Sequence, residues 1–208
     1  MSLQQDEIKV KIMHEAEALF MKFGFKSITM DDVARELGIS KKTLYQYFED
    51  KNDLVNQAVT QYLCDERKQC ESVVSTNDDP ITYMLKVTDT LSDRRRQINP
   101  GVLFDLKKYF KPAWDQINEF TTMYVFENVL QNIELGKSKG YYYKDINEKL
   151  IARLYVHLID FIISPEKNMH ENKHFVELHL EVMKYHLRAI CTDKGLKILN
   201  ERLKEIKN

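Results

Sequence analysis

Residues 27–54 read SITMDDVARELGISKKTLYQYFEDKNDL, and this stretch decides how the rest of the chain is interpreted. Two short helical patterns flank the turn Gly38-Ile39-Ser40. The apolar residues on either side of the turn recur at helical spacing: Val33, Ala34 and Leu37, then Leu44 and Phe48. Glycine permits the backbone conformation that lets a helix end and the chain turn sharply. The stretch therefore predicts a helix-turn-helix, whose second helix lies in the major groove of DNA.

Capping residues mark where these helices begin. Thr29 followed by Asp32 is similar to a capping box at the start of the first helix. Ser40 is a favourable N-cap for the second helix. Asp50 followed by Asp53 is a similar start for a third helix. A third helix so close behind would brace the second helix from one side.

The second helix turns polar side chains outward. With Leu44 and Phe48 facing inward, the residues left outward or sideways are Lys41, Lys42, Thr43, Tyr45, Gln46 and Tyr47. Lysine meets phosphate oxygens, glutamine bonds base edges, and threonine and tyrosine offer hydroxyl groups and apolar contacts. The set suits nucleic acid. A solvated helix face between two buried residues remains the alternative.

A longer pattern extends this reading. It runs Thr29-x-x-x-Val33-Ala34-x-x-x-Gly38-Ile39-Ser40-x-x-Thr43-Leu44-Tyr45-x-Tyr47-Phe48-x-x-Lys51-x-x-Leu54. This pattern resembles the TetR family of bacterial transcriptional regulators, and it covers about a quarter of the chain. Lys42 stands where that family often has Gly, and Tyr47 stands where it often has His. Lys42 could add a phosphate contact, which puts the base preference in doubt.

The resemblance implies two sets of DNA contacts. Thr29, Tyr47 and Lys51 are expected at the DNA backbone. The residues expected in or beside the groove are Lys41, Lys42, Thr43, Tyr45 and Gln46. For Lys51 the physical argument agrees, because a helix N-terminus favours a phosphate through its free N–H groups and its dipole.

Composition is that of a soluble, all-α protein. Of the 208 residues, 43% are hydrophobic and 30% charged, and only six are Gly and four Pro. The net charge is −1, and residues 1–51 hold eight Lys and Arg against nine Asp and Glu. Any DNA affinity must therefore come from the placement of charge rather than from its sum. Three cysteines without metal spacing, no signal-peptide pattern and no run of 18 apolar residues predict a cytoplasmic protein without a membrane span.

The division of the chain is expected near residue 52. Residues 1–52 are predicted to form a helix-turn-helix DNA-binding domain, an N-terminal three-helix bundle. Residues 53–208 are predicted to form a larger C-terminal helical domain for effector binding and dimerisation. The helices expected outside the motif span about 6–23, 51–75, 81–98, 100–110, 112–139, a segment opened by Asp145 and Glu148, and 171–191, with a short amphipathic tail after Gly195.

Two functions are expected of the larger domain. The helices near 146–163 and 171–191 resemble the TetR-family dimer interface, and a two-fold dimer would read two half-sites about 34–36 Å apart. A small-molecule pocket is implied by the resemblance, with Phe110, Trp114, Tyr124 and His157 as candidate lining. The competing interpretation is that these aromatic residues are core and that His157 is a hydrogen-bonded core histidine.

Arg94-Arg95-Arg96 is interpreted as a solvated helix end, with a site for an acidic ligand as the alternative.

One motif is typical of a different function, that of a zinc enzyme. His170-Glu171-Asn172-Lys173-His174 matches H-E-x-x-H, which on a helix places two histidines for zinc with the glutamate as base. The nearest further candidate ligand, His179, lies about 140° around the helix from His174, so the third ligand is missing. A zinc-dependent hydrolase is therefore only a remote alternative.

The sequence thus predicts a sequence-specific DNA-binding transcriptional regulator, with repression favoured over activation. It would bind palindromic double-stranded DNA as a homodimer and respond to an unknown small-molecule effector. No catalytic residue, cofactor or metal site is assigned. The alternative in the same fold is a DNA-binding structural or partner-recruiting protein without an effector.

Overall fold

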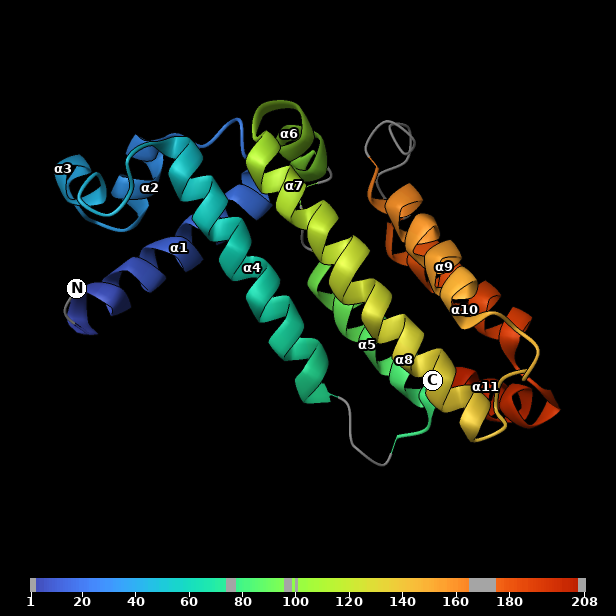
Figure 1. Ribbon diagram of the computed structural model, residues 1–208. Coiled ribbons are helices and arrows are strands. Elements are labelled where there is room, and N and C mark those ends of the chain that lie inside the picture. Colours follow the sequence, from blue (N-terminus) through green and yellow to red (C-terminus); the bar gives the residue numbers. More distant parts are fainter. Residues whose placement is uncertain (1–2, 74–77, 96–98, 100, 165–174, 206–208) are drawn as a thin grey trace. The chain divides into compact units, whose positions relative to one another are not determined.

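The computed structural model describes residues 3–73, 78–95, 99, 101–164 and 175–205. Within these residues the elements are helices, as predicted, and none of them is long and apolar enough to cross a membrane. The chain forms two compact units (Figure 1). The head unit comprises Met1–Arg67 and Gln97–Asn118, and the bundle unit comprises Lys68–Arg96 and Glu119–Asn208.

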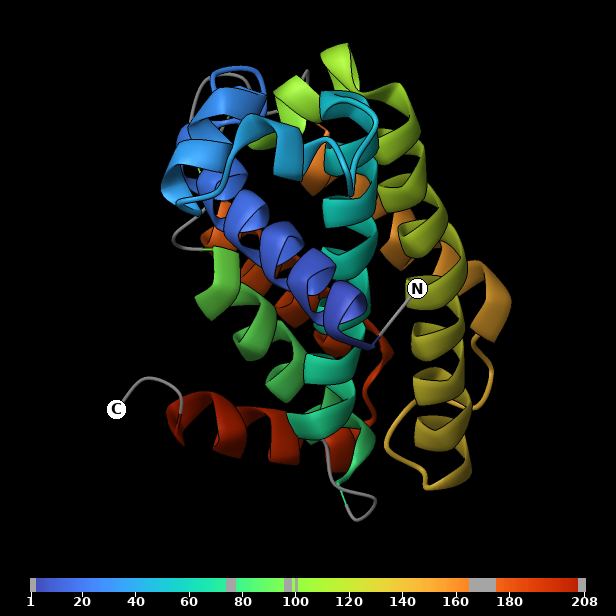
Figure 2. The same ribbon diagram turned by 90° about the vertical axis from the view of Figure 1, so that its left-hand side faces the viewer.

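The head unit is built on the predicted helix-turn-helix and its flanking helices. Its elements are α1 (Leu3–Phe23), α2 (Met30–Glu36), α3 (Lys41–Leu44), α4 (Lys51–Val73, up to Arg67), α6 (Val102–Tyr109) and α7 (Lys111–Glu119, up to Asn118). Figure 2 shows α1 crossing α4 within this unit. Their apolar faces share one core, which includes Phe20, Phe25, Leu44, Phe48 and Leu54. The first helix, expected from residue 6, begins at Leu3.

Two helices from the middle of the chain also belong to the head core. Phe110 and Trp114 are each 7% exposed and pack in the same cluster as Phe20 and Phe25. The Asp105 carboxylate of α6 accepts the Lys26 backbone N–H at 2.9 Å, which ties α6 to the loop before α2. The compact units therefore do not divide at residue 52, although the division of DNA-binding and effector roles at that residue stays a prediction.

The bundle unit contains the remaining helices. They are α5 (Pro80–Arg95), the π-helical segment η1 (Phe120–Val125), α8 (Phe126–Ser138), α9 (Glu148–Ile163), α10 (Phe175–Ile190) and α11 (Asp193–Glu205). Their core is a second apolar cluster, centred on Ile81, Ile133, Met183 and Leu187. The tail helix α11 packs on this cluster through the fully buried Leu199, so the tail is docked rather than frayed over Asp193–Glu205.

Two local features differ from the expectation, and a third expectation is not tested. The segment expected as one helix over 112–139 consists of α7, η1 and α8, and π-helical turns of this kind often occur at functional sites. The helix expected to open at Asp145 begins at Glu148, because the Asn147 side chain accepts the Leu150 N–H and acts as the N-cap. The side chains of Arg94, Arg95 and Arg96 lie outside the described residues.

A buried hydrogen-bond chain holds the loop after α8 in the bundle core. The Tyr142 hydroxyl donates to the Asn132 side chain at 3.0 Å, and the Asn132 amide donates to the Pro80 carbonyl at 2.8 Å. The Tyr142 ring lies directly over Gly136, where an added Cβ would fall 2.0 Å from a ring carbon. Glycine at 136 is therefore required by this close approach.

We expect Gly136→Ala to destabilise the protein by about 1–3 kcal/mol, because Tyr142 is fully buried and cannot move without opening the core. Urea unfolding measures the change. Ser138→Ala, an exposed substitution on the same helix, is the control and should change stability by less than about 0.5 kcal/mol. Equal stability of the two variants would show that Tyr142 does not pack as described.

Candidate functional site

Helix α2 begins with the complete capping box that the sequence predicts. The Thr29 hydroxyl accepts the Asp32 backbone N–H at 3.2 Å, and the Asp32 carboxylate accepts the Thr29 backbone N–H at 3.0 Å. The same carboxylate accepts the Thr29 hydroxyl at 2.6 Å, and these hydrogen bonds lower the pKa of Asp32. Val33 and Ala34 are buried below, so α2 is anchored from its first turn.

Helix α3 follows a turn in which Gly38 has φ +66°, the left-handed conformation that glycine adopts readily. The Ser40 hydroxyl accepts the Thr43 N–H at 3.0 Å, as an N-cap does. Leu44 is completely buried, and Phe48, just beyond the helix, is 1% exposed. These contacts fix which face of α3 points to solvent.

The exposed surface of α3 and of the turn after it, residues 45–47, carries most of the residues predicted to meet DNA. Lys41, Lys42, Tyr45 and Gln46 are exposed, with 45% of Tyr45 open to solvent. Thr43 and Tyr47 are half-buried. The Thr43 hydroxyl is hydrogen-bonded to Ser40 at 2.7 Å, so it is already engaged within the turn.

Two of the predicted backbone contacts are engaged inside the head unit. The Lys51 ammonium donates to the Lys26 carbonyl at 3.2 Å and lies 5.5 Å from the centroid of the Phe110 ring. Burial lowers the pKa of Lys51, with partial compensation from the negative charge of Asp105. The Thr29 hydroxyl serves the capping box. To donate to a phosphate, the Thr29 hydroxyl must therefore leave Asp32, whereas the Lys51 ammonium has three N–H donors and can keep its bond to Lys26.

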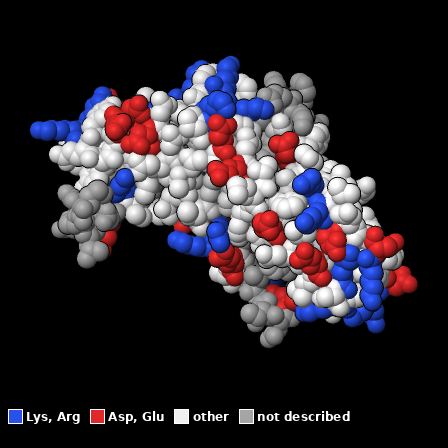
Figure 3. Space-filling view, viewed as in Figure 1, with Lys and Arg blue, Asp and Glu red and all other residues white. Residues whose placement is uncertain are grey.

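Acidic groups lie next to the basic ones on this surface. The Lys41 ammonium is 2.7 Å from the Asp31 carboxylate of α2, and this pair raises the pKa of Lys41. Figure 3 shows acidic side chains gathered beside basic ones over the α2–α3 part of the head unit. Affinity for DNA cannot come from a uniform basic patch here. It depends on which cations remain available.

The residues predicted to line a ligand pocket fall into both units. Phe110 and Trp114 are core residues of the head unit. Tyr124 lies in η1 and packs against Phe120 with tilted rings whose centroids are 4.8 Å apart, while His157 is exposed on α9. The expectation that His157 is a core histidine is wrong, because its helix turns it outward. Whether these four residues contact a ligand stays a prediction.

The bundle unit holds a buried polar pair that the sequence reading missed. Tyr155 of α9 and His186 of α10 are 4% and 6% exposed, and their ring centroids are 4.7 Å apart. The His186 Nε2 has no hydrogen-bond partner among the described residues. Burial lowers the pKa of His186 to about 4 and raises that of Tyr155, so both side chains are neutral at ordinary pH. Both residues lie among apolar residues of their helices, so apolar periodicity alone did not single them out.

Buried polar atoms in proteins are nearly always hydrogen-bonded, and exceptions call for an explanation such as water or a ligand. The Tyr155–His186 pair is therefore a candidate anchor for a bound molecule. The H-E-x-x-H motif at 170–174, in contrast, lies outside the described residues.

Comparisons with known proteins agree with the geometry of the head unit. Residues 12–58 match the sequence profile of bacterial regulatory proteins of the tetR family. The HTH-type transcriptional regulator YvaF of Bacillus subtilis is 32% identical over 160 residues, which are 75% of this chain and 81% of YvaF. IcaR of Staphylococcus aureus, described as a negative transcriptional regulator of the icaADBC biofilm operon, is 36% identical over 52 residues, only 25% of this chain and 28% of IcaR.

Solved structures show the same fold along most of the chain. A transcriptional regulator from Cytophaga hutchinsonii superposes with a TM-score of 0.71 at 20% identity, covering 88% of this chain and 98% of that one. A regulator from Saccharomonospora viridis, solved in complex with choline, gives 0.71 at 16% identity, covering 90% and 99% of the two chains.

The Lys41–Asp31 pair leads to a prediction about DNA affinity. Asp31→Asn removes one negative charge and releases Lys41, so DNA binding should tighten about two- to fivefold, the range expected for an exposed ion pair. Fluorescence anisotropy with duplex DNA measures it. Asp115→Asn breaks a similar exposed pair, with Lys111 at 3.0 Å on α7, and should leave affinity unchanged. If Asp31→Asn does not exceed the Asp115→Asn control, Lys41 takes no part in binding.

Proposed function

Because the chain belongs to the TetR family of bacterial transcription regulators, we propose that it binds a palindromic operator as a homodimer and releases it in response to a small molecule. The observation that carries this proposal is the exposed face of α3, held by the Ser40 cap and by buried Leu44. Repression is the favoured direction, as in the negative regulator IcaR, whose match includes only about 52 residues.

Dimerisation is supported by an exposed apolar stripe on the bundle unit. Leu150, Leu154 and Phe161 of α9 are 57%, 58% and 42% exposed, and with exposed His157 they follow a spacing of four, three and four residues. This spacing places them on one face of the helix. On α10, Tyr185 is 69% exposed. An exposed apolar face of this kind usually marks an interaction site, here for a second copy of the chain.

We predict that Leu154→Glu makes the protein monomeric, since a charge would be buried in the proposed interface. Binding to a palindromic site should weaken about 100-fold or more, because the two heads would no longer bind as one linked pair. Analytical ultracentrifugation and DNA titration test both statements. Leu135→Glu is the matched control, because Leu135 is an exposed leucine on α8 at 42% exposure. A dimer that survives Leu154→Glu would exclude the α9 interface.

Effector binding is supported by the Tyr155–His186 pair. Its two side chains are neutral, buried and in ring contact within an apolar bundle, which suits an uncharged polar group on a mainly apolar molecule. The regulator of similar fold from Saccharomonospora viridis was solved with choline, a small molecule. The pocket predicted at Phe110, Trp114, Tyr124 and His157 is a separate hypothesis.

Helix α4 offers the route from effector to DNA. It begins at Lys51, directly after α3 and its following turn, and it contributes residues to the head unit up to Arg67 and to the bundle unit from Lys68. A ligand that tilts α4 would change the separation of the two reading helices in a dimer. The ligand can shift DNA binding only if its affinities for the DNA-binding and DNA-released states differ.

A panel of neutral phenols and small ketones tests the effector site. A compound that binds there should raise the melting temperature of the wild-type protein and release it from its operator, because it stabilises one state. Tyr155→Phe should reduce both effects, since it removes one hydrogen-bonding group. Tyr143→Phe, on an exposed tyrosine outside the proposed interface, should reduce neither. A compound that releases DNA equally well from Tyr155→Phe would place the effector site elsewhere.

If the protein instead regulates without an effector, Tyr155→Phe should be more stable or unchanged and no compound should alter DNA binding. That outcome would favour the partner-recruiting alternative.

A further inference from the structure

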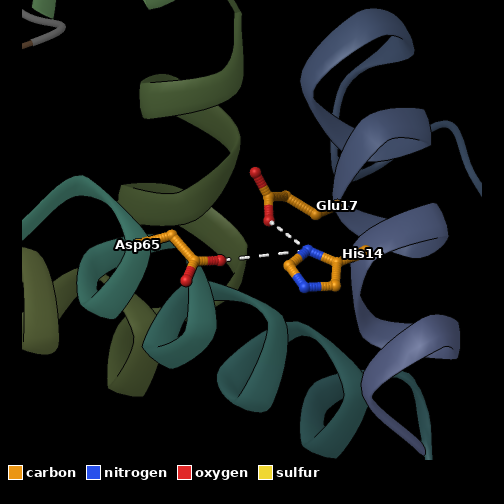
Figure 4. Close-up of side chains that lie close together, drawn as sticks. All are labelled: His14, Glu17 and Asp65. Atoms are coloured by element: carbon orange, nitrogen blue, oxygen red, sulfur yellow. Dashed lines mark ion pairs between the residues drawn. The ribbon is translucent and has the colours of Figure 1, made fainter. Parts of the chain in front are cut away.

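Three possible metal ligands converge between α1 and α4 in the head unit (Figure 4). The His14 Nδ1 lies 3.9 Å from the Glu17 Oε2 and 3.9 Å from the Asp65 Oδ2. The three donor atoms all lie within 4.8 Å of one another. His14 and Glu17 are three residues apart on α1 and so share a face, and Asp65 reaches them from α4. Asp65 is about 50 residues away from His14 and Glu17 in the sequence, so the fold of the chain brings the three side chains together.

The donor types suit a divalent transition metal. Imidazole nitrogen and carboxylate oxygen are both donors that bind zinc in proteins, and water can complete such a set. The two carboxylates bring two negative charges close together, and a divalent cation between them would neutralise both. The side chains of Glu17 and Asp65 are only 14% and 28% exposed, whereas His14 is 49% exposed. The site is thus partly screened from solvent but open on one side for an ion and its water ligands.

A neighbouring side chain orients one of the carboxylates. The Gln61 amide, one turn before Asp65 on α4, donates to both Asp65 oxygens at 3.0 Å. Hydrogen bonds from a second layer of residues commonly fix metal-binding carboxylates in this way.

We propose that His14, Glu17 and Asp65 bind a divalent transition ion of the zinc class and thereby clamp α1 to α4. Ligands held about 2.0–2.2 Å from a tetrahedral ion are about 3.3 Å apart, so the donors need to close by about 0.5–1.5 Å. Rotation of exposed side chains supplies such movement. Water completes the coordination on the side where His14 is open.

The clamp acts on the part of α4 that leads toward the bundle unit. Asp65 lies two residues before Arg67, the last residue that the head unit takes from α4. An ion held there would stabilise the head unit by fixing α4 to α1. Ion binding does not depend on the proposed regulatory function. A result that overturns the metal site would therefore leave the proposed function unaffected, and the reverse also holds.

The competing account is a simple ion pair between a protonated His14 and the two carboxylates. That arrangement needs no metal, and it predicts no specific zinc binding that depends on His14 and Asp65. Zinc titration therefore separates the two accounts.

The test uses the full chain with three substitutions that remove other possible zinc ligands: His170→Gln, His174→Gln and Cys64→Ser. Isothermal titration with ZnCl₂ should show one ion per chain, and the melting temperature should rise by about 5 °C at a hundredfold excess over the dissociation constant. Adding His14→Gln or Asp65→Asn should weaken binding more than about tenfold. The matched control is Asp115→Asn, which removes an exposed carboxylate of α7 and should bind zinc normally.

The melting temperature of each variant without metal checks that it folds. If the background protein binds no zinc up to about 100 µM, or if His14→Gln and Asp65→Asn bind zinc as tightly as the background, the proposal is overturned.

Discussion

Burial of Leu44 and Phe48 in the head core is the constraint on which the DNA-reading surface depends. Because these two side chains point inward, Lys42, Tyr45 and Gln46 are held outward. The helix that presents them is only four residues long, so its own hydrogen bonds cannot keep it folded. The Ser40 cap and the core of α1, α2, α4, α6 and α7 supply what α3 lacks.

Local chemistry made much of this predictable from the sequence. The caps at Thr29 and Ser40 and the left-handed Gly38 depend on neighbouring residues, and each was found as expected. Apolar periodicity identified buried faces but not what covers them. It could not assign α6 and α7 to the head core, nor separate inward Tyr155 from outward Leu154. Contacts with DNA and ligand remain predictions for the same reason, since they involve a second molecule.

The near-neutral head has a consequence for recognition. In the free protein, two of the cations predicted to meet DNA already have a partner. Lys41 is paired with Asp31, and Lys51 donates to the Lys26 carbonyl. Weak general attraction to phosphate leaves more of the discrimination to side chains that reach base edges. The proposed release by an effector requires a change in head geometry. The proposed ion at His14, Glu17 and Asp65 would act on the stiffness of that same geometry.

Selection from a random duplex DNA library, followed by sequencing, tests the central claim most directly. The account predicts enrichment of a palindrome with half-sites about 34–36 Å apart at about 0.15 M salt, and loss of that enrichment in Tyr45→Ala, whose side chain is exposed on the reading surface. Enrichment of no sequence, or of the same palindrome by Tyr45→Ala at unchanged affinity, would contradict it.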